Sequence, residues 1–560
     1  MPSIKNATIY FDPDNADALD RNDREADDEG FLRGFLRHAD VDAFHFFNAA
    51  GRPIAGLEAL IARIEQPTKP VNWINRRGRQ ALADPGCLYR LSPSLAGEAW
   101  ARRPLGPARY SLCGLVPPLA RMTVMDRLAE LAIAPLECWD ALICTSRALR
   151  ASVEAELAAV RDDLTRRLGA TRLPHPELAM IPEGVSAGEF KRSQAHRQAW
   201  RELLNIPPTA VVALHAGRLS VTEEGNPAVM AMVLERAAQA TGLDIYWVVA
   251  GWGATKELSD EFHQKTRGLC PSVHYRPVDG RPPEARFSIW SVADFFIAFP
   301  DNIEGRCGLT ATEAMAAGLP CVVSDWGSHR DIVQHEIEGF RIPIYSPRPG
   351  LGRDLAFSHA NQWVTPEHYL ASAAQMTSID LRLASEAVSA LVSDRALRDR
   401  LGAAALQRAV STFDWSVVIP QYQALWTELS QRRQAAQTQK VPGASIVDNP
   451  RRLDPFRLFA GYPTQALSTE DAIMVTPGLD WAGARTILNR PLAAIGRSAL
   501  PSIEEAEHAF AYIAAHPQAT IAEVVAQFPP PRRSFVVRGL LWLVKFGLLI
   551  LVPKVAPTVS

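Results

Sequence analysis

Short apolar segments rich in β-branched and aromatic residues alternate with stretches of helical periodicity along most of the chain. This alternation predicts parallel sheets whose strands are joined by crossover helices. The strands fall into two series, predicted at residues 7–12, 42–48, 109–115 and 139–146, and at residues 211–218, 245–253, 273–280, 293–300 and 320–325. We therefore expect an α/β protein with two Rossmann-like domains facing each other across a cleft.

Changes in composition predict where these domains end. Turn-forming residues at 181–190 separate the two series, so we expect one Rossmann-like domain at residues 1–185 and a second at residues 186–429. Residues 430–453 are rich in Gln and Arg and lack an apolar period, which is typical of a linker.

Residues 454–560 form a third predicted unit, which is mainly helical. Ser502 with Glu505 and Thr520 with Glu523 each fit a capping box that opens an amphipathic helix. A third helix then precedes an apolar strand. Three helices and a strand indicate a winged-helix-like C-terminal extension, for which protein docking is favoured over nucleic-acid binding because the region is only weakly basic.

Composition narrows the class of protein. Hydrophobic residues make up 47% of the chain and charged residues 21%, which is typical of a globular protein, and the net charge of -2 offers no basic field for nucleic acid. The seven cysteines form no metal-ligand spacing and no disulfide framework. Neither a secretion signal nor a transmembrane segment is predicted, so we expect a cytoplasmic protein without a metal site.

The candidate chemistry lies in residues 301–343. A predicted strand ends at Pro300, and a helix is expected to begin near Thr310 and to end before Gly318. The N-terminus of such a helix carries unpaired N–H groups and about half a positive unit charge, which suits a diphosphate. One turn into the helix, the carboxylate of Glu313 is placed to accept hydrogen bonds from both ribose hydroxyls.

The unbroken string GLTATEAMAAGLPCVVSD at residues 308–325, followed by Glu338, Gly339 and Phe340, resembles the signature of the retaining GT-B glycosyltransferases of family 4. The likeness covers most of residues 180–430, more weakly the first domain, and the part beyond Asp454 looks like an extension found in some bacterial members. It implies transfer of a hexosyl unit from a nucleoside diphosphate sugar, with no metal and no further cofactor. It also implies that the helix containing Tyr422 and Trp426 crosses back to the first domain.

The resemblance also implies roles for individual residues. The predicted catalytic residues are Arg218 and Glu304. The residues expected to bind the donor are Gly217, Arg218, Val278, Asp279, Gly308, Leu309, Thr310 and Glu313, with Arg218 and the amides of Leu309 and Thr310 on the phosphates, Glu313 on the ribose, and Val278 and Asp279 beside the base.

Three positions depart from the family pattern. Glu224 stands in the segment where the family has a phosphate-binding lysine, Gly305 occupies the place of the first glutamate with Glu304 one position early, and Pro117 lies where a histidine is usual. These departures leave alternatives to an active hexosyltransferase. One is an impaired homologue that acts as a binding or scaffolding subunit and docks a protein partner through residues 454–560; another, less favoured, is a winged-helix regulator that binds nucleic acid. The sequence names neither the sugar and nucleotide nor the acceptor.

Overall fold

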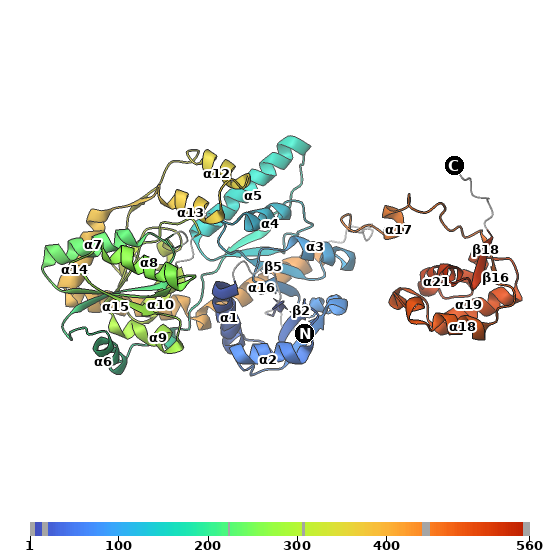
Figure 1. Cartoon of the computed structure of the whole chain (residues 1–560), viewed down its shortest axis with the longest axis horizontal. Coiled ribbons are helices and arrows are strands. Elements are labelled where there is room, and N and C mark those ends of the chain that lie inside the picture. Colours follow the sequence, from blue (N-terminus) through green and yellow to red (C-terminus); the bar gives the residue numbers. More distant parts are fainter. Residues whose placement is uncertain (1–5, 14–20, 222–223, 305–307, 439–448, 553–560) are drawn as a thin grey trace. The chain divides into compact units, whose positions relative to one another are not determined.

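The computed structural model describes residues 6–13, 21–221, 224–304, 308–438 and 449–552. It divides into two compact units, residues 1–449 and residues 450–560. The first unit contains two parallel sheets flanked by helices (Figure 1). Their topology confirms the expected α/β fold with two Rossmann-like domains, the arrangement known as GT-B.

The first sheet has seven parallel strands in the order β3-β2-β1-β4-β5-β6-β7. Their bounds are β1 Thr8–Phe11, β2 Phe44–Asn48, β3 Val71–Asn75, β4 Cys87–Arg90, β5 Ser111–Leu115, β6 Ala141–Cys144 and β7 Glu177–Met180. The connecting helices are α1 Arg21–His38, α2 Ile54–Ile64, α3 Ala96–Arg102, α4 Met122–Leu131 and α5 Arg147–Leu168. Strands β3, β4 and β7 were not predicted, because their residues include Asn, Arg or Glu and form no continuous apolar run.

The second sheet has six parallel strands in the order β10-β9-β8-β11-β12-β13. Their bounds are β8 Val211–Arg218, β9 Ile245–Trp252, β10 His274–Asp279, β11 Phe295–Ala298, β12 Cys321–Ser324 and β13 Gly339–Ile342. All five strands predicted for the second series are present, and β13 adds an edge strand. The apolar runs of β8, β9, β11 and β12 were recognisable because both faces of this part of the sheet are buried under helices.

Helices cover both faces of the second sheet, and an apolar core lies between the sheet and the helices on each face. They are α6 Gln194–Leu203, α7 Pro227–Thr241, α8 Lys256–Arg267, α9 Pro283–Ser288, α10 Gly308–Ala316, α11 His329–Ile332, α14 Leu381–Ser393 and α15 Arg395–Arg408. The segment between β13 and α14 contains β14 Ile344–Tyr345, α12 Arg353–Ala360, α13 Pro366–Ala374 and β15 Ser378–Ile379.

The long helix α16, Trp415–Thr438, packs against the first domain, as expected for the helix that contains Tyr422 and Trp426. The ring of Tyr422 lies 5.1 Å from that of Phe31, and the ring of Trp426 lies 5.9 Å from that of Phe35. The helix continues to Thr438, into the segment 430–453 predicted as a linker, because the Gln, Arg and Ala residues there are good helix formers.

The chain crosses between the two domains twice, and the two crossings are hydrogen-bonded to each other. The amide of Val185 donates to the carbonyl of Phe413 at 2.8 Å, and the amide of Trp415 donates back to the carbonyl of Val185 at 3.1 Å. The side chain of Trp415 fills the space above Gly34 and Gly184, where an added Cβ would lie 2.6 Å and 2.3 Å from the indole. The relative position of the domains is therefore constrained at this crossing.

The second unit combines helices with a small antiparallel sheet in the order β17-β16-β18. Its elements are α17 Pro455–Leu458, β16 Ala472–Val475, α18 Trp481–Leu488, α19 Ile503–Ala515, β17 Ala519–Thr520, α20 Ile521–Ala526, α21 Arg533–Lys545 and β18 Leu549–Val552. Both predicted capping boxes are present, at the starts of α19 and α20. Arg532, one of the basic residues beside α21, forms an ion pair with Glu505 at 2.6 Å.

Candidate functional site

A cavity of about 830 Å³ lies in the first unit, where the carboxyl ends of strands from both sheets meet. From the first domain it is lined by residues that follow β5, β6 and β7, and from the second by the ends of β8 and β9 and the start of α10. In parallel α/β sheets this edge is where ligands bind. The cavity is the candidate active site.

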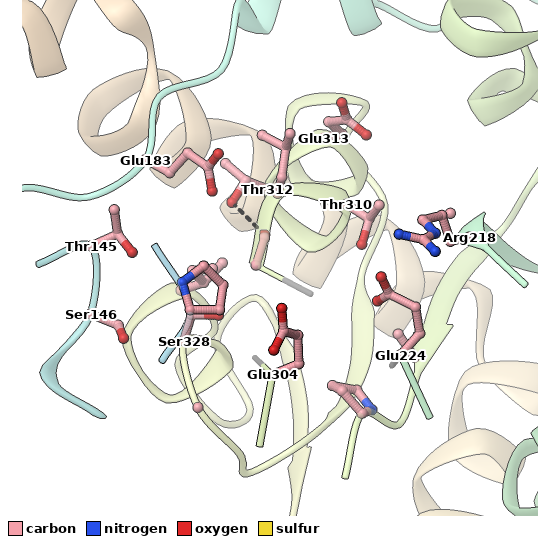
Figure 2. A pocket seen from close by; sticks show the side chains of 18 of the residues that line it. Thr145, Ser146, Glu183, Arg218, Glu224, Glu304, Thr310, Thr312, Glu313 and Ser328 are labelled. Carbon is pink, nitrogen blue, oxygen red and sulfur yellow. Dashed lines mark hydrogen bonds between the residues drawn. The ribbon is translucent and has the colours of Figure 1, made fainter. Parts of the chain in front are cut away.

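The second domain contributes a strand end and a helix start that lie close together. Arg218 is the last residue of β8, and α10 begins at Gly308, two residues earlier than predicted. The hydroxyl of Thr312 donates to the carbonyl of Gly308 at 3.0 Å, within the first turn of α10 (Figure 2). A Cβ on Gly308 would lie 2.7 Å from the Ser328 hydroxyl oxygen, so close packing there requires glycine.

Most of the sequence-predicted residues meet in this cavity. Its lining includes Gly217, Arg218, Glu304, Gly308, Leu309, Thr310 and Glu313, together with two of the departures, Pro117 and Glu224. The third departure, Gly305, lies outside the described residues. In Figure 2 the carboxylates of Glu224 and Glu304 and the guanidinium group of Arg218 point toward the same space beside Thr310.

The two residues predicted beside the base do not line the cavity. Val278 and Asp279 are the last residues of β10, and their neighbours Gly280 and Arg281 line it instead. Hydrogen bonds from Arg281, one of them 2.7 Å long, lower the pKa of Asp279. The contact of Val278 and Asp279 with the base stays a prediction, and in this segment the cavity lining begins at Gly280, the residue that follows them.

Glu304 is almost completely buried, with 2% of its side chain exposed. Its amide donates to the side-chain oxygen of Asn302 at 2.7 Å, and the Asn302 carbonyl accepts from the indole N–H of Trp326 at 2.8 Å. These bonds attach the loop before α10 to the loop after β12. They hold the backbone at Asn302 and Glu304 in place at the cavity wall.

Two ion pairs connect the first domain to the second at the cavity. The Nε of Arg121, which immediately precedes α4, lies 3.4 Å from an Oε1 of Glu304. Arg147, the first residue of α5, donates its amide to Asp331 at 2.7 Å and forms an ion pair with the same carboxylate. Neither pair was predictable from the sequence, because the partners are more than 180 residues apart and neither arginine belongs to a motif.

Burial changes the acid–base character of two groups near the cavity. Burial lowers the pKa of His215, whose ring nitrogen lies 3.1 Å from the carbonyl of Ile297, so this imidazole is neutral at pH 7. Burial also raises the pKa of Asp301, the residue before Asn302, to about 6. Within the described residues there is no group of three or more His, Cys, Asp and Glu side chains placed to hold a metal ion.

Comparison with known proteins agrees with this geometry. Residues 210–349 match the family model described as glycosyl transferases group 1, a segment that extends from β8 through β14 and includes Arg218, Glu304 and α10. The matched segment therefore covers the second-domain side of the cavity.

Two curated relatives are similar over part of their length. The lipopolysaccharide 1,2-N-acetylglucosaminetransferase of Salmonella typhimurium is 28% identical over 177 residues, which is 30% of this chain and 44% of that protein. The D-inositol 3-phosphate glycosyltransferase of Jonesia denitrificans is 29% identical over 206 residues, which is 35% of this chain and 47% of that protein. The chain thus matches less than half the length of these two relatives.

Among solved structures, Anabaena HepE in complex with UDP aligns with 78% of this chain and 100% of its own, with 14% identity and a TM-score of 0.46. A glycosyltransferase from Rickettsia africae aligns with 76% of this chain and 98% of its own, with 12% identity and a TM-score of 0.44. Among the described residues, every helix is too short or too polar to cross a bilayer.

Proposed function

We propose that this protein is a glycosyltransferase of the family 4 type, which transfers a hexosyl unit from a nucleoside diphosphate sugar to an acceptor with retention at the anomeric carbon. The observation that carries the proposal is the placement of Arg218, Glu313 and the start of α10 around one cavity between two Rossmann-like domains. The group 1 family match over residues 210–349 supports it independently.

In this proposal the donor diphosphate lies at the N-terminus of α10. The amides of Leu309 and Thr310 and the guanidinium group of Arg218 donate hydrogen bonds to the phosphate oxygens, and Glu313 accepts from the ribose hydroxyls. The base lies near Gly280 and Arg281, which line the cavity where Val278 and Asp279 do not.

The transfer breaks the bond between the anomeric carbon and the diphosphate oxygen and forms a bond from the acceptor oxygen on the same face of the sugar. The acceptor proton passes to the departing phosphate oxygen. Arg218 and the α10 amides stabilise the charge that develops on that group, which is electrostatic preorganisation. Glu304, which forms an ion pair with Arg121, accepts hydrogen bonds from the sugar hydroxyls.

Calorimetric titration with UDP, GDP and their sugars, followed by a donor-hydrolysis assay, tests the proposal. We expect micromolar nucleotide binding and slow donor hydrolysis. Glu313→Gln should weaken nucleotide binding about tenfold, equivalent to about 1.4 kcal/mol, whereas the control Glu367→Gln, an exposed glutamate of α13, should leave it unchanged. No nucleotide binding at millimolar concentration would refute the proposal.

The same experiment separates an enzyme from an impaired homologue. The presence of Glu224 and Pro117 in the cavity lining is what favours the second candidate, a nucleotide-binding scaffold that docks a protein partner through residues 454–560. Nucleotide binding without any donor hydrolysis or transfer would support the scaffold.

A further inference from the structure

The two walls of the cavity differ in chemistry. On the first-domain wall, the side chains that follow β5 and those at the start of α5 are mostly apolar: Val116, Pro117, Pro118, Leu119, Ala148 and Leu149. All of these except Val116 are only half-buried, so they present apolar surface to the cavity. This surface faces the space left beside the proposed donor.

The positively charged side chains of the cavity lining are also divided unequally between the two walls. Within the described lining, the cations Arg218, Arg281, Arg286 and Arg330 all belong to the second domain, whereas the charged side chain from the first domain is Glu183. In Figure 2, Glu183 and Thr145 lie on the side opposite Arg218. The first-domain arginines nearest to this space, Arg121 and Arg147, do not belong to the lining and form ion pairs with carboxylates of the second domain.

A phosphorylated or otherwise anionic acceptor is a poor match for this wall. It would lose water against Leu119, Leu149 and the two prolines, and it would be repelled by Glu183. The cations next to this wall, Arg121, Arg147 and Arg330, already form ion pairs with carboxylates of the second domain. An apolar group on the acceptor gains free energy on the same surface because it leaves water. A neutral hydroxyl can still find a hydrogen-bond acceptor in Glu183 and a donor in Thr145.

We propose that the acceptor is an uncharged hydroxyl compound with an apolar alkyl or aryl group, and that this group packs on the wall formed by residues 116–119 and 148–149. This inference rests on the proposed function and specifies its second substrate. The reacting hydroxyl then lies between Thr145 and Glu183 and the bound donor.

Calorimetry on the full chain saturated with UDP or GDP tests the acceptor class, with four glucosides as probes. These are n-octyl glucoside below its micelle concentration, phenyl glucoside, glucose and glucose 6-phosphate. We expect one of the two apolar glucosides to bind at least tenfold more tightly than glucose, and glucose 6-phosphate to bind most weakly. The better of the octyl and phenyl compounds identifies the apolar group as alkyl or aryl.

Two variants test the location of this site. Leu149→Arg and Ala148→Arg should each weaken binding of the preferred apolar glucoside about tenfold, strengthen binding of glucose 6-phosphate, and leave nucleotide affinity within twofold. Leu168→Arg is the control, because Leu168 ends the same helix, is 63% exposed and does not line the cavity. Thermal melting identifies any variant that has lost its fold. In that case the remaining one of the two arginine variants in the wall tests the location of the site.

The possible results distinguish this inference from the proposed function. Tighter binding of glucose 6-phosphate than of both apolar glucosides, or equal effects of Leu149→Arg and Leu168→Arg, would overturn the acceptor class while nucleotide binding persists. A complete lack of nucleotide binding would overturn both.

Discussion

Removal of Arg121 should show how strongly the two domains are coupled at the site. Two unit charges 3.4 Å apart attract each other by about 5 kcal/mol at an effective dielectric constant of about 20. Much of this is offset by the cost of taking the Glu304 carboxylate, 2% exposed, out of water. Because 21% of the Arg121 side chain is exposed, we expect a net coupling of about 1–2 kcal/mol rather than the full value.

The test is a double-mutant cycle with Arg121→Met, Glu304→Gln and the double variant, measured by urea denaturation. Arg121→Met should cost about 2–3 kcal/mol, because it leaves a charged carboxylate buried opposite a thioether. Glu304→Gln should cost less, and the double variant should be more stable than the sum of the two effects predicts.

Arg77→Met is the control for this cycle, because Arg77 is an exposed arginine of the first domain that does not line the cavity. It should change the free energy of unfolding by less than about 0.5 kcal/mol. A coupling below about 0.3 kcal/mol between Arg121 and Glu304 would show that the contact between the domains is not an energetically significant ion pair.

Three further variants test the surroundings of the site. Asp301→Asn should stabilise the protein by about 1–3 kcal/mol at pH 7.5 and have little effect at pH 4. Burial raises the pKa of Asp301 to about 6, so folding favours its protonated form, and the contribution of this group to stability falls as pH rises from about 4 through 6. An equal effect of the substitution on the urea midpoint at both pH values would contradict this. Gly339→Ala should destabilise the protein by at least about 2 kcal/mol, because the added Cβ would lie 1.9 Å from the carbonyl oxygen of Cys321. The control Gly352→Ala should be tolerated, because its added Cβ meets open space. Equal melting temperatures of the two variants would contradict the register of β12 and β13. Glu224→Lys should strengthen nucleoside diphosphate binding about tenfold in calorimetry, and unchanged affinity would mean that this loop does not face the phosphates.

Four strands of the second sheet, β8, β9, β11 and β12, were predictable because they are mainly apolar. Each lies between two layers of helices, so most of its side chains on both faces are buried and hydrophobic. The edge strand β10 is partly exposed and contains several polar residues. Strands β3, β4, β7 and β13 were not predicted, because each is short and includes a polar or charged residue, so that none forms a continuous apolar run.

The second-domain side of the candidate site was also visible in the sequence. Arg218 at a strand end, Gly308 at a helix start and Glu313 one turn later are determined by local chain geometry, and all three line the cavity. The contact of Val278 and Asp279 with the base stays a prediction, because they end β10 and only the two residues after them line the cavity.

The amino-acid sequence by itself determined the repeating strand–helix units and the helix N-terminus at which a diphosphate is proposed to bind, because these depend on residues close together in the chain. Only the tertiary structure decided what faces that helix. The pairing of Arg121 with Glu304 and of Arg147 with Asp331, and the apolar wall opposite the cations, join segments from separate domains. Such contacts depend on how two folded domains meet, and no local pattern of residues records this.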